Sequence, residues 1–164
     1  MGEPRSIGII GGAGWLGRAI AEAVVDAAMV RPEQLTLSYR SGRPEFLPDA
    51  VWTRDNQALA DRSDIVIVSV RPQDFPAIDV AAEGKLVVSV MAGIPIDRLS
   101  RHFGTRRVVR TLPNAAAEVR KSYTPWVASD GVTEEDRDVV RRILEACGTA
   151  DEIAKEADID YLTG

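Results

Sequence analysis

Residues 7–17 (IGIIGGAGWLG) join a short apolar run to a cluster of glycines. The run Ile7–Ile10 has the β-branched, almost wholly apolar character of a strand that is covered on both faces. Gly12, Gly14 and Gly17 then have the spacing G-x-G-x-x-G, and a helical pattern begins inside this motif, at Leu16. A strand, a glycine turn and a helix in this order predict the first unit of an α/β fold.

The rest of the chain repeats this alternation of strand and helix. Further short β-branched runs indicate strands, with a weaker candidate at Val51–Thr53, and apolar residues at helical spacing mark the stretches between them. Such alternation implies β-α-β units with right-handed crossovers, so we predict a Rossmann-like, doubly wound α/β fold with a mostly parallel sheet. The main predicted strands are residues 7–10, 35–39, 65–70, 86–90 and 108–112, and helices are predicted from Leu16 and over residues 95–103 and 133–146.

Length and composition narrow the class of protein. A chain of 164 residues with 45% hydrophobic residues is long enough to bury a core as one domain. Its 20 basic and 25 acidic residues give a net charge of -5, which provides no field for gathering nucleic acid. One Cys and one His leave no disulfide and no cluster for structural zinc. We expect a cytoplasmic protein that binds no nucleic acid, membrane or metal.

The glycine turn is typical of a dinucleotide-binding site. Gly12 would permit the tight turn, Gly14 would let a pyrophosphate approach the backbone, and Gly17 would allow close packing of helix and sheet. The N-terminus of the helix would offer N–H groups to the phosphates. A mononucleotide P-loop is disfavoured, because Arg18 and Ala19 stand where that motif needs a lysine and a hydroxyl. A turn that serves packing alone remains the alternative. The predicted contacts here are Gly12, Ala13, Gly14, Trp15, Leu16 and Gly17.

The end of the second predicted strand indicates which dinucleotide is preferred. An NAD site normally has an acidic residue there, which binds the ribose 2′-hydroxyl. This chain has Ser38-Tyr39-Arg40-Ser41 instead. Arg40 can pair with a 2′-phosphate and Ser41 can donate a hydrogen bond to it, so we predict that NADP(H) is preferred over NAD(H). The alternative is that Arg40 is simply solvated.

Motifs farther along the chain resemble those of the pyrroline-5-carboxylate reductases. Val70-Arg71-Pro72-Gln73 is similar to the V-K-P-Q of that family, and Met91-Ala92-Gly93-Ile94 to its A-G turn. Arg110-Thr111-Leu112-Pro113-Asn114 is similar to its R-x-M-P-N, in matching order and spacing. Residues 156–163 resemble the stretch that leads into the second domain of the family.

The resemblance implies an NADPH-dependent reductase of a small cyclic imine, most simply of pyrroline-5-carboxylate to proline. It implies that Asn56 binds the adenosine ribose and that Asn114 lies near the nicotinamide, although Asn56 can equally be a helix N-cap and Asn114 a plain loop residue. Carboxyl ends of strands, where the other motifs fall, are where open α/β sheets bind ligands. The implied contacts are Asn56, Val70, Arg71, Pro72, Ala92, Gly93 and Asn114.

The resemblance also sets the expected domain organisation. Residues 1–155 are expected to form the dinucleotide-binding domain, and residues 156–164 to begin the connection to a helical domain absent from this chain. That domain would supply the substrate loop, the proton donor and a homodimer interface, so the chain alone is expected to be inactive. A non-catalytic NADP(H)-binding module, or a related dehydrogenase with another small substrate, remains the alternative.

Overall fold

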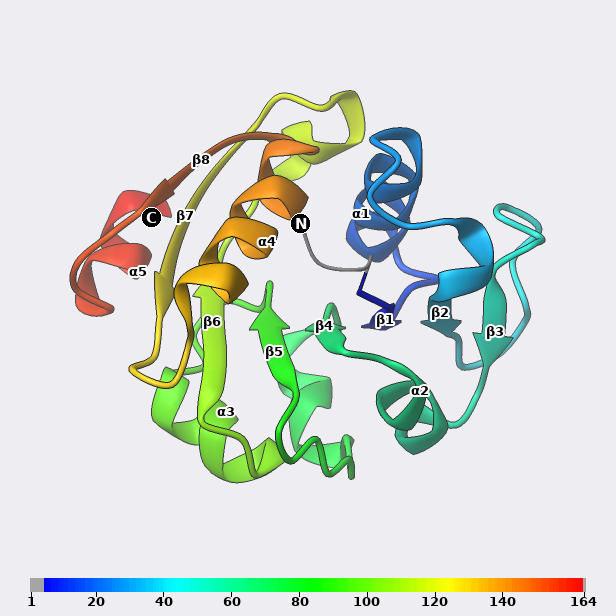
Figure 1. Ribbon diagram of the computed structural model, residues 1–164, viewed down its shortest axis with the longest axis horizontal. Helices are drawn as coiled ribbons and strands as arrows, with labels where there is room; N and C mark the ends of the chain where they lie inside the picture. Colours follow the sequence, from blue (N-terminus) through cyan, green and yellow to red (C-terminus); the bar gives the residue numbers. More distant parts are fainter. Residues whose placement is uncertain (1–4, 164) are drawn as a thin grey trace.

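The fold is described by a computed structural model of residues 5–163, which includes every side chain except those of residues 115 and 161–163. Eight strands form one sheet in the order β3-β2-β1-β4-β5-β6-β7-β8 (Figure 1). Every neighbouring pair is parallel except β6 and β7. The predicted Rossmann-like α/β class is confirmed. The strands are β1 (Ile7–Ile10), β2 (Leu35–Ser38), β3 (Val51–Thr53), β4 (Ile65–Val68), β5 (Leu86–Ser89), β6 (Arg107–Thr111), β7 (Ser122–Ala128) and β8 (Gly148–Glu152).

Helices cover both faces of the sheet, as a doubly wound fold requires. Helices α1 and α4 pack on the face that buries Ile9, whereas α2, η2 and α3 pack on the face that buries Ile10 (Figure 1). Successive residues of β1 therefore enter different cores, which explains why this strand is apolar throughout rather than alternating. The helices are α1 (Trp15–Asp26), α2 (Asn56–Arg62), α3 (Ile96–Phe103), α4 (Glu134–Glu145) and α5 (Ala157–Thr163), with short 3-10 helices η1 (Pro32–Gln34), η2 (Pro72–Ala77) and η3 (Ala115–Val119).

Helix α4 begins where the sequence predicts. The Thr133 side chain accepts a hydrogen bond from the Asp136 backbone, and the Asp136 side chain accepts one from the Thr133 backbone, which makes a capping box. The first turn of the helix is acidic, and Asp136 within it is fully buried. The helix ends at Glu145 with Ala146 as its C-cap, within one residue of the predicted end, and Gly148 begins β8.

Strands β7 and β8 were not predicted from the sequence. In β7, Ser122 and Thr124 are buried polar residues that hydrogen-bond to each other, and Pro125 interrupts the β-branched pattern. The burial pattern of β8 contains only exposed and half-buried residues, as befits the last strand of the sheet. Neither strand shows the apolar run that marks a strand buried on both faces.

Within residues 5–163, no helix has both the length and the apolar character needed to cross a membrane.

Candidate functional site

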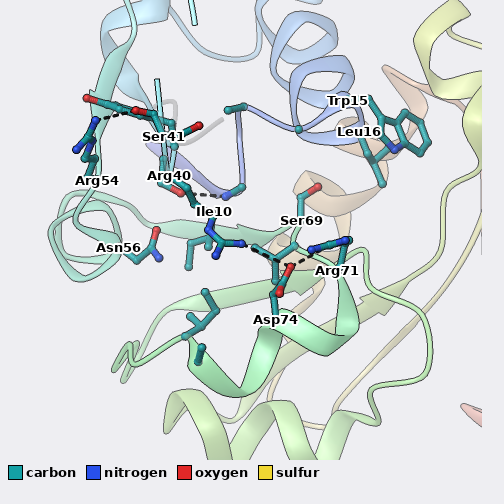
Figure 2. A pocket seen from close by; sticks show the side chains of 18 of the residues that line it. Ile10, Trp15, Leu16, Arg40, Ser41, Arg54, Asn56, Ser69, Arg71 and Asp74 are labelled. Atoms are coloured by element: carbon teal, nitrogen blue, oxygen red, sulfur yellow. Dashed lines mark hydrogen bonds and ion pairs between the residues drawn. The ribbon is translucent and has the colours of Figure 1, made fainter. Parts of the chain in front are cut away.

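A pocket of about 880 Å³ lies at the carboxyl ends of β1, β2 and β4 (Figure 2). Strand β1 lies between β2 and β4, so the chain turns in opposite directions along the sheet from this point. Open α/β sheets bind their ligands at such a switch point. The pocket is lined by the glycine turn, the segment after β2, the start of α2 and the segment after β4.

The glycine turn presents the N-terminus of α1 to this pocket. Gly14 is the N-cap residue of α1; it makes no side-chain cap, and the first turn of the helix holds no acidic residue. The first N–H groups of a helix have no partners within the helix and carry partial positive charge. Ser38 fixes the turn, because its hydroxyl accepts a hydrogen bond from the Gly11 amide at 2.9 Å. The turn is therefore suited to an anionic group such as a pyrophosphate.

The roles of the individual glycines differ in part from those predicted from the sequence. The left-handed conformation of the turn is at Gly11, with φ +83°, and not at Gly12. A Cβ atom on Gly12 would lie 2.9 Å from the Leu37 side chain, so this glycine permits close packing on β2. A Cβ atom on Gly17 would lie 2.5 Å from the Gly11 carbonyl oxygen. Gly17 thus allows the close packing of α1 that was predicted for it.

Charged side chains surround the other end of the pocket. Arg54 donates a hydrogen bond to the Ser41 carbonyl oxygen at 2.8 Å, and its guanidinium lies 5.3 Å from the centre of the Tyr39 ring. Arg71 Nε donates to Asp74 Oδ2 at 3.0 Å, and Arg40 Nη1 lies 3.8 Å from the same oxygen. Three arginines and one carboxylate give this end of the pocket a net positive charge.

Asn56 supplies an unsatisfied polar atom to the pocket. Asp55, and not Asn56, is the N-cap residue of α2, because its side chain accepts hydrogen bonds from the Gln57 and Ala58 amides. The N-cap alternative for Asn56 is therefore wrong. Asn56 Oδ1 is buried, and it has no hydrogen-bond partner within residues 5–163. A buried carbonyl oxygen without a donor is costly, so this atom favours a ligand that brings a hydroxyl group.

The pocket brings together most of the residues predicted as cofactor contacts, but not all. Asn114 lies outside it and caps η3, accepting a hydrogen bond from the Ala116 amide at 3.0 Å. Val90, directly after β5, lines the pocket, but the exposed turn residues Ala92 and Gly93 do not. The predicted contacts that line the pocket are Ala13, Gly14, Trp15, Leu16, Arg40, Ser41, Asn56, Val70 and Arg71, and those that do not are Gly12, Gly17, Pro72, Ala92, Gly93 and Asn114.

Sequence reasoning missed five residues of the pocket that carry polar groups, namely Ser38, Tyr39, Arg54, Ser69 and Asp74, of which two are charged. A signal for the two charged residues was present in the sequence. Parallel strands end at one edge, so a charged residue shortly after β3, such as Arg54, or in the segment after β4, such as Asp74, belongs to the same region as Arg40. The hydrogen bond of Ser38 to the Gly11 amide depends on the register of β1 and β2, which only the structure gives.

Comparisons with known proteins agree with this geometry. Residues 6–93 match the family model described as NADP oxidoreductase, coenzyme F420-dependent. A pyrroline-5-carboxylate reductase of Methanosarcina acetivorans is 32% identical over 99% of this chain and 63% of its own length. Pyrroline-5-carboxylate reductase 2 of Bacillus subtilis is 28% identical over 97% of this chain and 60% of its own length. The chain thus spans about three fifths of these relatives, and the resemblance seen in the motifs is confirmed.

Two solved structures have a fold similar to that of this chain. A pyrroline-5-carboxylate reductase of Coxiella burnetii has the same fold, with a TM-score of 0.90 and 22% identity over 98% of this chain and 63% of that one. A pyrroline carboxylate reductase of Plasmodium falciparum, solved with NADP bound, has a TM-score of 0.83 and 25% identity over 98% of this chain and 62% of that one.

Proposed function

The chain belongs to the NADP oxidoreductase, coenzyme F420-dependent, family, and on this premise we propose that it is the NADP(H)-binding part of a reductase that converts pyrroline-5-carboxylate to proline. The support for the substrate is the similarity over nearly the whole chain to reductases of that name. The support for the cofactor is the pocket itself.

The observation that carries the proposal is the buried Asn56 Oδ1, which lacks a partner within the described residues and lines the pocket. In this proposal it accepts a hydrogen bond from a ribose hydroxyl of the adenosine. The α1 N-terminus at Gly14 would hold the pyrophosphate, and Arg40 with Ser41 would hold the 2′-phosphate. The pocket therefore offers an acceptor for the ribose, N–H donors for the pyrophosphate and a positive charge for the 2′-phosphate.

In this proposal the chain contributes to the reaction by orienting the nicotinamide and by excluding water from it. The reduced nicotinamide, when bound, supplies the hydride, so the protein needs mainly to position it against the imine carbon. Val70 and Arg71 line the pocket after β4, and Pro72 follows them. Ala92, Gly93 and Asn114 follow β5 and β6, and we propose that they face the nicotinamide and the substrate once a second domain is in place.

The remaining parts of the reaction are assigned outside these residues. We propose that residues 1–155 form the cofactor domain and that residues 156–164 begin the connection to a helical domain that brings the proton donor, the substrate site and a homodimer interface. The relatives' greater length supports this division. A location in the cytoplasm is proposed because the single cysteine, Cys147, is free and buried.

A titration with NADPH and with NADH tests the cofactor assignment. Trp15 lines the pocket, so binding is expected to quench tryptophan fluorescence. One charge-assisted hydrogen bond to the 2′-phosphate would favour NADPH by about tenfold to a hundredfold, and Arg40→Ala should remove most of that preference. Arg141→Ala is the matched control, because Arg141 pairs with Asp138 on α4, away from the pocket. Absence of saturable binding of either nucleotide, checked by calorimetry, would end the proposal.

Reduction itself is measured with the whole natural protein. Consumption of NADPH on addition of pyrroline-5-carboxylate, with proline as the product, is the expected result. Tight NADPH binding without any consumption would instead favour a non-catalytic NADP(H)-binding module.

A further inference from the structure

Asp74 lies at the positively charged end of the pocket, between two arginines that come from different segments. Arg40 follows β2, whereas Arg71 and Asp74 belong to the segment after β4. Figure 2 shows both guanidinium groups directed toward the Asp74 carboxylate, with Arg40 on one side and Arg71 on the other. The contact between Arg40 and Asp74 therefore spans the pocket from one strand end to another.

The two arginines differ in how firmly they are tied to this carboxylate. Arg71 Nε hydrogen-bonds to Asp74 Oδ2 at 3.0 Å, and the Asp74 amide donates to the Arg71 carbonyl oxygen at 2.9 Å. Arg40 is 85% exposed at its side chain and approaches the same oxygen only to 3.8 Å. Asp74 is nevertheless its one ion-pair partner among the described residues. Arg71 thus anchors the carboxylate, while Arg40 is free to exchange it for another anion.

A phosphate monoester at the pocket would compete for the same guanidinium. Such a group carries nearly two negative charges at neutral pH, so it is attracted to Arg40 and repelled by Asp74. A nucleotide with a free 2′-hydroxyl brings no such charge. The carboxylate therefore opposes the binding of one nucleotide and is almost neutral toward the other.

We propose that Asp74 is a specificity-determining residue whose carboxylate competes with the cofactor 2′-phosphate for Arg40 and so limits the preference for NADPH over NADH. This inference rests on the proposed NADP(H) site. When NADPH binds, Arg40 leaves Asp74 for the phosphate, and Arg71 retains the carboxylate. Asp74 thus narrows the difference in affinity between NADPH and NADH by weakening the binding of NADPH.

The test is the dissociation constant of each nucleotide, measured by calorimetry for the wild type and for Asp74→Asn. The substitution keeps the shape of the side chain and removes its charge. NADPH is expected to bind about three- to tenfold more tightly, and NADH to change by less than about twofold. Glu83→Gln is the matched control: it removes one negative charge at an exposed position just before β5, at the opposite edge of the sheet, and should change neither constant.

The same substitution made in the Arg40→Ala variant tests the competition directly. In Arg40→Ala, the gain that Asp74→Asn gives to NADPH should become clearly smaller, because Arg40 is no longer there to be released and only the direct repulsion between Asp74 and the phosphate is removed. Thermal melts establish that each variant is folded. An equal gain for both nucleotides, no gain for NADPH, or an undiminished gain in Arg40→Ala overturns the inference. A wild type that binds neither nucleotide overturns the proposed function itself, which is a distinct result.

Discussion

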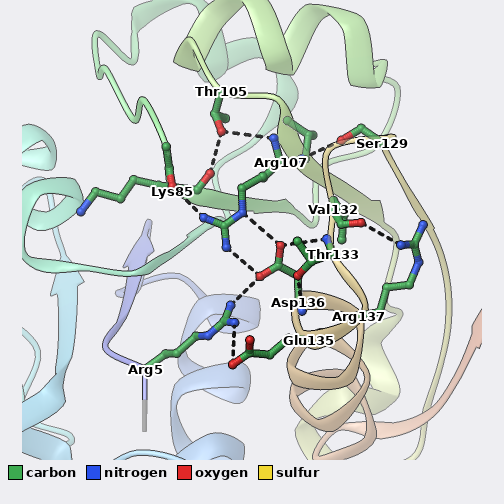
Figure 3. A network of polar contacts seen from close by, with 12 residues as sticks. Arg5, Lys85, Thr105, Arg107, Ser129, Val132, Thr133, Glu135, Asp136 and Arg137 are labelled. Atoms are coloured by element: carbon green, nitrogen blue, oxygen red, sulfur yellow. Dashed lines mark hydrogen bonds and ion pairs between the residues drawn. The ribbon is translucent and has the colours of Figure 1, made fainter. Parts of the chain in front are cut away.

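Asp136 shows how one buried charge is held in this molecule. Its Oδ2 accepts a hydrogen bond from Arg107 Nε at 3.0 Å, and its Oδ1 accepts from Arg107 Nη2 at 2.7 Å and from Arg5 Nη1 at 2.6 Å (Figure 3). Burial alone would raise the pKa of this carboxyl group. The hydrogen bonds from Arg107, Arg5 and the Thr133 backbone outweigh burial and hold the pKa well below the ordinary value of 3.8. The carboxylate thus joins the segment before β1, strand β6 and helix α4.

We expect Asp136→Asn to lower the free energy of unfolding at neutral pH by about 2–4 kcal/mol, because two arginines lose their shared anion. Since the pKa is lower in the folded than in the unfolded chain, the contribution is complete above about pH 4 and is lost as the pH falls further. Urea unfolding of both forms over a range of pH measures this. The gap between them should narrow below pH 4, and a gap independent of pH would contradict the ion-pair account.

At the scale of elements, a buried arginine holds helix α5 on the sheet. Arg110 of β6 is 3% exposed; its Nη2 lies 2.6 Å from Asp160 Oδ1, and its Nη1 lies 3.3 Å from Glu156 Oε1. The same Glu156 oxygen accepts a hydrogen bond from the amide of Ile96, the first residue of α3, at 2.7 Å. One carboxylate therefore links the segment before α5, strand β6 and the start of α3.

Arg110→Ala should release α5 more than it unfolds the domain. Asp160 and Glu156 are partly exposed and can be hydrated, so we expect a loss of about 1–3 kcal/mol, together with faster amide exchange in α5 and at the start of α3. Hydrogen exchange read by mass spectrometry measures this. Arg141→Ala, whose pair with Asp138 is exposed, should cost less than about 1 kcal/mol and leave α5 unchanged. Unchanged exchange in Arg110→Ala would show that apolar packing alone holds the helix.

These elements also show how far the sequence could predict the fold and the site. Strand β1, the glycine turn and the capped start of α4 have local signals, and each was found. No local pattern marks Asp136 as a buried charge, because its partner Arg5 lies 131 residues away in the sequence. The position of Asp74 opposite Arg40 likewise depends on which strands are neighbours. Local patterns identified the segments that line the pocket. Which charged residues face each other across it could be predicted only from the order of the strands in the sheet.

In the whole molecule, the pocket and the Asp136 network, which consists of Asp136, Arg107 and Arg5, lie at opposite ends of the strands. The pocket is at the carboxyl ends of the strands, while Arg5 precedes β1 and Arg107 is the first residue of β6. Strands of four or five residues separate these ends by roughly 13–17 Å. The two sites share no partner among the described residues. Their contributions to stability are therefore expected to be independent.

This independence can be measured through ligand binding. NADPH at about a hundred times its dissociation constant should raise the free energy of unfolding by about 2.7 kcal/mol, because it binds the folded chain. The same increment is expected in Asp136→Asn, to within about 0.5 kcal/mol, since distant sites without shared partners add. Urea unfolding with and without NADPH gives both increments, and NADH at the same concentration should give a smaller one. An increment that changes by more than about 1 kcal/mol in Asp136→Asn would mean that the sheet transmits strain from its amino edge to the pocket.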